Sequence, residues 1–117
     1  MIENNSKAVR DLIPEIIKLS GRKCMISKLS DSDFLPELEK KLEEELKEYL
    51  DSKELEELSY LLEVIYRIAE LRGSSKAELE EIRERKKQKK GGFEENLLLV
   101  NLLEESFHDR LYPVAST

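Results

Sequence analysis

Two long stretches with helical periodicity, residues 34–50 and 54–72, are separated by only three residues. In each stretch apolar side chains recur at intervals of three and four, which places them on one face of a helix. The "SDSD" sequence at 30–33 offers N-cap residues for the first helix, and Gly73 suits the end of the second. Because the connection is so short, the second helix must run back along the first. The pattern therefore predicts an antiparallel helix hairpin.

Two further helices are predicted on either side of this hairpin. Residues 9–19 carry one apolar face, with Pro14 in the first turn and Gly21 at the exit. The sequence "SKAE", which begins at Ser75, matches a capping box and opens a helix that ends at Gly91. The four helices together predict an all-α fold.

The composition is consistent with an all-α protein. Charged and hydrophobic residues each make up 39% of the 117-residue chain, which is typical of a folded helical protein rather than a disordered one. We expect a single helical domain over 1–117, with a core at about 7–95 and a C-terminal tail at 96–117. The pattern of residues 22–30 favours a β-strand or an extended segment, and the tail could be an extended segment followed by a short helix. Because so short a chain buries little apolar surface, we expect a helical bundle that assembles as a homodimer or homotetramer.

The charge and the cysteine content exclude several classes of protein. A net charge of −6 argues against generic binding to nucleic acid or to acidic membranes. No apolar run approaches the roughly 18 residues of a membrane-spanning helix, and the first residues lack the apolar region of a secretion signal. We therefore expect a cytoplasmic protein. Cys24, the single cysteine, has no disulfide partner within the chain and is predicted to be a packing residue.

Some glutamates of the hairpin fall among apolar side chains. Ten carboxylates lie in the 21 positions from Glu37 to Glu57, and most project to a polar side. Glu45 projects into the apolar sector of the first helix, and Glu48 lies about 60° further toward the edge of that sector. Glu57 projects inside the apolar arc of the second helix, which is wide enough to predict that this helix is largely buried.

A buried carboxylate needs a partner. Transfer from water without one costs several kcal/mol, and we expect no Lys or Arg of the hairpin beside these acids. Glu45, Glu48 and Glu57 could instead converge on a divalent cation, for which oxygen ligands favour Mg²⁺ or Mn²⁺. The alternative is that burial is partial and that the glutamates reach solvent or pair with lysines from elsewhere.

The sequence also resembles a known family. "LEEELKEYL" followed by "EELSYLLEVIY" resembles the E-x-x-E…E-x-x-D signature of the MazG-like all-α nucleoside triphosphate pyrophosphohydrolases, which include phosphoribosyl-ATP pyrophosphohydrolase. "KAVRDLIPEII" at 7–17 is similar to the opening of one MazG-like branch, and "RERKKQKKGGF" at 83–93 to its basic helix end. These matches occur in the family's order and cover roughly residues 7–95.

The resemblance implies an oligomeric helical bundle that holds Mg²⁺ and cleaves a nucleoside triphosphate to the monophosphate and pyrophosphate. By position, Glu45 and Glu48 match E-x-x-E, and Glu57 matches the third acid. These three residues are the expected catalytic and metal-binding groups. Tyr60 occupies the position of the fourth acid, so the chain departs from the family there.

Cationic side chains are expected to bind the substrate phosphates. The candidates for substrate binding, with Tyr60 added for its hydroxyl group, are Lys7, Arg10, Tyr60, Arg83, Lys86, Lys87 and Lys90. The basic run from 83 to 90 can also be read as a solvated helix end whose charge complements the helix dipole. A nucleic-acid surface is disfavoured because no aromatic residue is interleaved with these charges.

Two other functions are compatible with the pattern. Because Tyr60 replaces an acid, the chain could be a catalytically impaired relative that binds a nucleotide or a partner without hydrolysis. Alternatively, the hairpin could be a non-enzymatic dimerisation module. The adjacent His108 and Asp109 lack a Ser or Cys partner and receive no catalytic role.

Overall fold

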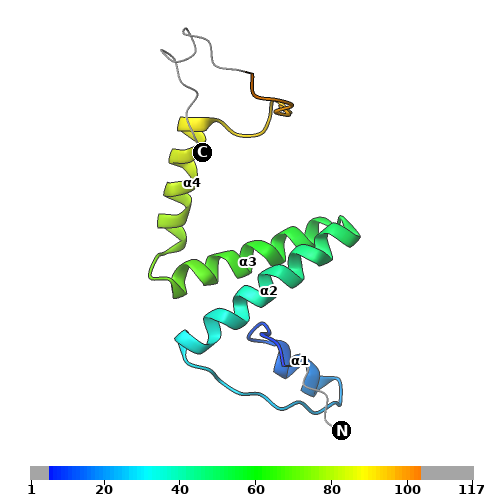
Figure 1. The fold of residues 1–117 in the computed structure, drawn as a ribbon. Helices are drawn as coiled ribbons and strands as arrows, with labels where there is room; N and C mark the ends of the chain where they lie inside the picture. The colour runs from blue at the N-terminus through cyan, green and yellow to red at the C-terminus, as the bar shows by residue number, and fades with distance from the viewer. Residues whose placement is uncertain (1–5, 104–117) are drawn as a thin grey trace. The chain divides into compact units, whose positions relative to one another are not determined.

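The computed structural model describes residues 6–103 and is all-helical over that range, with four α-helices and no strand (Figure 1). This confirms the predicted all-α fold. The helices are α1 (Ile13–Leu19), α2 (Asp31–Ser52), α3 (Leu55–Leu71) and α4 (Lys76–Lys90). Within the described residues, every helix is too short or too polar to cross a membrane. The predicted short helix of the tail falls largely on residues 104–117, outside the described range.

Helix α2 begins three residues before the predicted start because Ser30 caps it. Ser30 has extended backbone angles, and its Oγ accepts a hydrogen bond of 3.2 Å from the N–H of Asp33. The helix ends where Lys53 adopts a left-handed conformation, with φ of 59°. The Oγ of Ser52 then accepts a hydrogen bond of 3.2 Å from the N–H of Glu54, just before α3. Local hydrogen bonding thus sets the sharp reversal between the two helices.

Helix α3 packs along α2 after this two-residue connection (Figure 1). Ion pairs join the end of α3 to the first half of α2. The guanidinium of Arg72 lies 2.8 Å from the Glu39 carboxylate, and that of Arg67 lies 3.8 Å from Asp31. Both pairs are exposed, so each adds little stability but agrees with the direction in which the helices pack.

The amino-terminal region is less regular than predicted. Helix α1 begins at Ile13, with Pro14 in its first turn, whereas periodicity placed its start near Val9. Residues 22–30 form no strand and are exposed throughout. Cys24 is therefore exposed as well, and its prediction as a packing residue is wrong.

Helix α4 begins after Ser75, the predicted N-cap residue. The Oγ of Ser75 accepts a hydrogen bond of 3.0 Å from the N–H of Glu78 and contacts its carboxylate at 3.2 Å. The Tyr66 hydroxyl of α3 donates a 3.3 Å hydrogen bond to Glu80. The chain divides within α4 into two compact units, residues 1–85 and 86–117.

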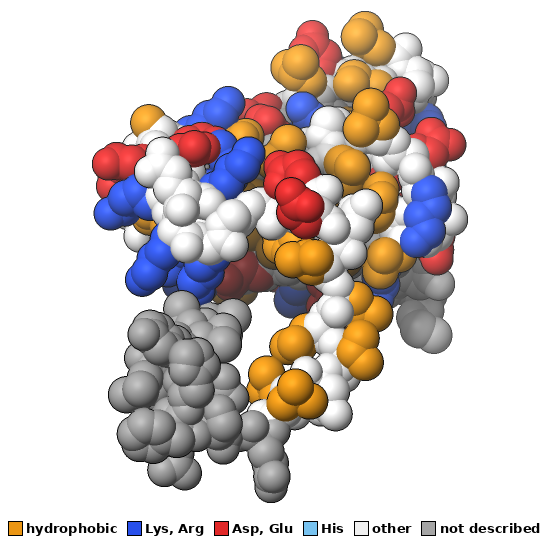
Figure 2. Space-filling view, turned by 90° about the horizontal axis from the view of Figure 1, so that it is seen from above, with side chains coloured by type: hydrophobic (Ala, Val, Ile, Leu, Met, Phe, Trp, Pro, Cys, Tyr) orange, Lys and Arg blue, Asp and Glu red, His pale blue; other side chains and the backbone are white. Residues whose placement is uncertain are grey.

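Little of the described chain is deeply buried. Ala8 and Leu38 are its buried apolar residues, and Glu45 is its buried charged residue. Helix α3 has no buried residue, so the prediction that it is largely buried is wrong for the single chain. Its side chains at Leu55 and Leu62 are 80% and 48% exposed, and hydrophobic side chains lie at the surface in Figure 2. The physical reason is that a wide apolar arc needs neighbours on two sides, and α2 covers one.

Candidate functional site

The site is built around Glu45, in the middle of α2. Its side chain is 11% exposed, and Oε1 lies 3.3 Å from Nζ of Lys41, whose side chain is 18% exposed. This corrects the expectation that no Lys or Arg of the hairpin lies beside the inward-facing acids. Lys41 is one helical turn before Glu45 and about 40° around the helix, so its side chain reaches Glu45 along the helix surface.

Glu57 approaches Glu45 from the first turn of α3. Its side chain is partly buried, and its carboxyl group lies close enough to that of Glu45 for a hydrogen bond. Desolvation raises the pKa of Glu57 above its ordinary value, and the negative charges of Glu45 and Glu48 raise it further. The hydrogen bond with Glu45 and the charge of Glu54 act in the same direction on this pKa. The two helices therefore bring the carboxyl groups of Glu45 and Glu57 together.

Glu48 lies at the edge of this carboxylate pair. It is exposed on α2, one turn after Glu45. Its negative charge contributes to the raised pKa of Glu57. In residues 6–103, no three or more acidic, His or Cys side chains are grouped as a ready metal site. Mg²⁺ commonly takes only one or two carboxylates and completes its shell with water and substrate phosphates. The pair formed by Glu45 and Glu57, with Glu48 nearby, is a donor set that fits this chemistry.

Tyr60 lies one turn after Glu57 on α3, where the resembled family has an acid. The guanidinium carbon of Arg10 is 5.8 Å from the centroid of the Tyr60 ring, within the range of a cation–π contact. The amino-terminal segment thus brings one predicted substrate-binding residue onto another. Tyr60 is partly exposed and contributes an aromatic face and a hydroxyl group in place of a negative charge.

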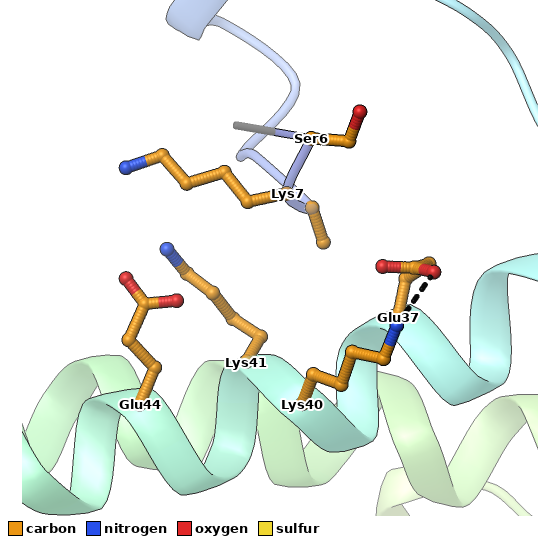
Figure 3. Close-up of a pocket in the computed structure, with 7 residues that line it drawn as sticks. Ser6, Lys7, Glu37, Lys40, Lys41 and Glu44 are labelled. Atoms are coloured by element: carbon orange, nitrogen blue, oxygen red, sulfur yellow. Dashed lines mark hydrogen bonds and ion pairs between the residues drawn. The ribbon is translucent and has the colours of Figure 1, made fainter. Parts of the chain in front are cut away.

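A pocket of about 170 Å³ lies between the amino-terminal segment and α2 (Figure 3). Residues 6–8 line one side of it, and the other side is lined by Glu37, Lys40, Lys41 and Glu44. Lys7 and Lys41 extend in the same direction in Figure 3, toward the side of the pocket where Glu44 lies. Nζ of Lys40 pairs with Oε1 of Glu37 at 3.3 Å.

Sequence reasoning missed the lysines of α2. Lys41 both lines this pocket and pairs with Glu45, so it connects the pocket to the carboxylate pair. The spacing of four between Lys41 and Glu45 was the signal that could have identified it, because residues at i and i+4 are neighbours on a helix.

The basic run is exposed along its whole length. Arg83 pairs with Glu80 at 2.9 Å and with Glu84 at 3.5 Å. The hydrogen bond between Arg83 and Glu80 lowers the pKa of Glu80 and raises the pKa of Arg83. Lys87 lies 3.7 Å from Glu94. A role of Arg83, Lys86, Lys87 and Lys90 in substrate binding stays a prediction.

The fold and the site define an all-α protein with a carboxylate pair between two packed helices. The chain matches no protein-family model, no curated protein and no solved structure. Its relation to the MazG-like family stays a prediction from the sequence motifs.

Proposed function

We propose that the protein is a MazG-like, Mg²⁺-dependent nucleoside triphosphate pyrophosphohydrolase, which converts a nucleoside triphosphate to the monophosphate and pyrophosphate. The observation that carries the proposal is the meeting of Glu45 and Glu57 from two helices. Two acids that are drawn together and desolvated repel each other, and this arrangement is costly unless a positive charge offsets it. Phosphate transfer to water is a reaction in which such a charge is useful.

Glu45 and Glu57 would hold the cation, with Glu48 as the third acid. A bound Mg²⁺ or Mn²⁺ supplies positive charge that offsets the charge of the phosphate oxygens. The oxygen-only donor set supports these two ions over zinc. The exposed Glu48 would orient the attacking water or accept its proton.

The remaining side chains bind the phosphates of the substrate. Water adds across the anhydride between the α- and β-phosphates, a new P–O bond forms and the bridging P–O bond breaks. Pyrophosphate leaves with high negative charge, so nearby cations stabilise it. Lys7 lines the pocket beside α2, and Arg10 lies on the ring of Tyr60. Both are candidates for this role.

The proposal includes a second copy of the chain. The α2–α3 hairpin exposes apolar side chains on both helices, among them Leu46 and Leu50 of α2 and Leu62 of α3. Burying this surface against another copy would complete a helical bundle and remove it from water. We therefore propose a homodimer or homotetramer built around paired antiparallel hairpins.

The direct test is a panel of nucleoside triphosphates incubated with Mg²⁺ or Mn²⁺ while released pyrophosphate is measured. We expect metal-dependent release with at least one nucleotide and its loss in Glu57→Gln. Glu43→Gln is the matched control because Glu43 is exposed and pairs with Lys47 at 4.0 Å, away from the site. Equal activity in the parent protein and Glu57→Gln would refute the proposal.

The position of Tyr60 favours a second candidate, a catalytically impaired relative that binds nucleotide without hydrolysis. Its support is the contact between Arg10 and the Tyr60 ring, which places an aromatic group and a cation where the resembled family has an acid. Under this candidate, Tyr60→Asp raises metal-dependent pyrophosphate release from the parent's baseline. No gain in a variant that still folds and binds nucleotide would mean that the chain departs from the family at more than the missing acid.

The non-enzymatic dimerisation module makes the opposite prediction for the metal. Without a metal site, Glu45→Gln and Glu57→Gln would be neutral or stabilising even with Mg²⁺ present, and Mg²⁺ would leave the melting temperature of the parent unchanged. A metal site requires the parent to be stabilised by Mg²⁺ and both variants to lose this effect.

A further inference from the structure

Lys41 belongs to two features at once. Its Nζ lies 3.3 Å from Oε1 of Glu45, and its side chain lines the pocket that also contains Lys7 and Lys40. In Figure 3 the side chains of Lys41 and Lys7 extend in the same direction, next to Glu44. One ammonium group is therefore within reach of both Glu45 and a pocket whose charged lining residues are three lysines and two glutamates.

The other lysine pairs of α2 differ from this one. Lys40 and Lys47 also pair with a glutamate on their own helix, yet both side chains are 74% exposed. Such exposed pairs are screened by water and exchange freely with it. The Lys41–Glu45 pair is largely shielded from water. A third charge that approaches this pair would therefore interact strongly with both groups.

A divalent cation that binds Glu45 would approach the carboxylate on which the Lys41 ammonium rests. Two positive groups at one carboxylate repel each other, particularly where water is largely excluded. A lysine side chain turns about four flexible bonds and needs no backbone movement to leave. The pocket beside α2 offers a place for the ammonium group among other polar side chains.

We propose that Lys41 is a displaceable counter-ion. It neutralises Glu45 when no divalent cation is bound, and it turns into the pocket beside Lys7 when a cation takes its place at Glu45. There it adds its charge to a subsite for the phosphate groups of the ligand. This inference rests on the proposed function, and it makes Lys41 a positioning residue that couples occupancy of the carboxylates to binding of phosphate.

The coupling has a consequence for the order of binding. Without a cation, Lys41 pairs with Glu45. Its positive charge is then neutralised and does not attract a ligand to the pocket. With a cation, the freed ammonium favours phosphate, and bound phosphate in turn favours the cation, because such coupling is reciprocal. The protein should therefore bind a phosphate ligand more tightly when Mn²⁺ is present.

The test is calorimetric titration of the full chain with Mn²⁺ alone, and then with inorganic pyrophosphate at saturating Mn²⁺. Removing the competing charge in Lys41→Met should tighten Mn²⁺ binding by about tenfold, the low end of the couplings between closely spaced charges. It should also weaken pyrophosphate binding by about tenfold. Lys41→Arg retains the charge and should keep Mn²⁺ affinity near that of the parent.

Lys47→Met is the matched control, since Lys47 pairs with an exposed glutamate of the same helix at the same spacing. It should leave both affinities unchanged. Unchanged or weaker Mn²⁺ binding in Lys41→Met would overturn the inference, with Lys41→Gln replacing that variant if it does not fold. If the parent binds no Mn²⁺ at all, the proposed metal site itself fails and the inference fails with it. Normal Mn²⁺ binding that Lys41 does not affect refutes the inference alone.

Discussion

The balance of charge at single residues decides what the site can do. Glu45 and Glu57 bring two carboxyl groups together, and Lys41 supplies one ammonium group against them. The charge of Glu48 adds to the excess of negative groups. Desolvation, and then repulsion from the charges of Glu45 and Glu48, raise the pKa of Glu57. The same excess that costs stability provides the attraction for a cation.

The raised pKa of Glu57 predicts how stability depends on pH. A carboxyl group whose pKa is raised by folding holds its proton more tightly in the folded state, so its stabilisation is present below the unfolded value of about 4.5 and is lost as pH rises through the folded pKa. Because glutamine does not ionise, Glu57→Gln does not lose stability at this position as pH rises. The variant should be more stable than the parent at pH 7, and the difference should shrink as pH falls through the raised pKa of Glu57 and be lost below about 4.5.

This prediction is checked by chemical denaturation in metal-free buffer between pH 4 and pH 7. Added Mg²⁺ should narrow the difference at pH 7 by stabilising the parent alone. A difference between parent and Glu57→Gln that does not vary with pH would contradict it. Glu43→Gln, on the exposed side of α2, supplies the baseline.

Lys41 is predicted to contribute to stability through Glu45. Lys41→Met leaves the shielded carboxylate without its counter-charge, which should lower the free energy of unfolding by about 1–3 kcal/mol in the absence of divalent cations. Lys47→Met, at an exposed pair, should change it by less than about 0.5 kcal/mol. Urea denaturation of both variants measures the two values, and equal small losses would show that the Lys41 pair is not special.

At the scale of the helices, hydrogen bonds at the helix ends explain where the elements begin. The Oγ of Ser30 satisfies the N–H of Asp33, and acidic residues in the first turn of α2 complement the helix dipole. These local signals are visible in the sequence. The predicted α4 likewise begins at Ser75, whose Oγ accepts a hydrogen bond from the N–H of Glu78 and donates one to the Glu78 carboxylate.

The cap of α2 gives a prediction at this scale. Ser30→Ala removes the acceptor for the Asp33 N–H and should lower the free energy of unfolding by about 1 kcal/mol. Ser59→Ala is the control, because the Ser59 hydroxyl donates to the carbonyl of Glu56 within α3 and caps nothing. It should be neutral or slightly stabilising. Equal losses for both variants by urea denaturation would argue against the cap.

The sequence pattern predicts which side of each helix a residue lies on better than it predicts what packs against that side. Periodicity placed Glu45 and Glu57 toward the apolar side, and the structure brings their carboxyl groups together. It did not place Lys41 there, since projection locates the base of a side chain and not the reach of a long one. It also predicted a buried α3. A wide apolar arc indicates that some surface covers the helix, but it does not identify that surface. The start of α1 was missed because Val9 continues the apolar spacing without helical backbone.

At the scale of the whole molecule, residues 6–103 expose much apolar surface. On α3, the exposed apolar side chains at 55, 58, 62 and 65 fall within a sector of about 80°, separate from the side that carries Glu57. Leu46 and Leu50 of α2 are exposed too. In the second unit, residues 97–103 carry further exposed leucines. A contiguous apolar face on a helix is typical of an interface. This face of α3 is the surface on which we propose that a second copy packs.

If a second copy packs on α3, a charge introduced in the exposed apolar sector of α3 should weaken the assembly. The parent should show a molecular mass of at least twice 13.7 kDa by light scattering, and a melting temperature that rises with protein concentration. Leu62→Glu places a charge in the middle of the exposed sector, where burial without a partner is costly, and should shift the protein toward monomer. Glu63→Gln, at the exposed adjacent position, should leave the mass unchanged. If Leu62→Glu retains the parent's mass and concentration dependence, the copies associate through another surface. A parent that is monomeric at all concentrations would instead mean that these leucines stay in water or meet a different partner.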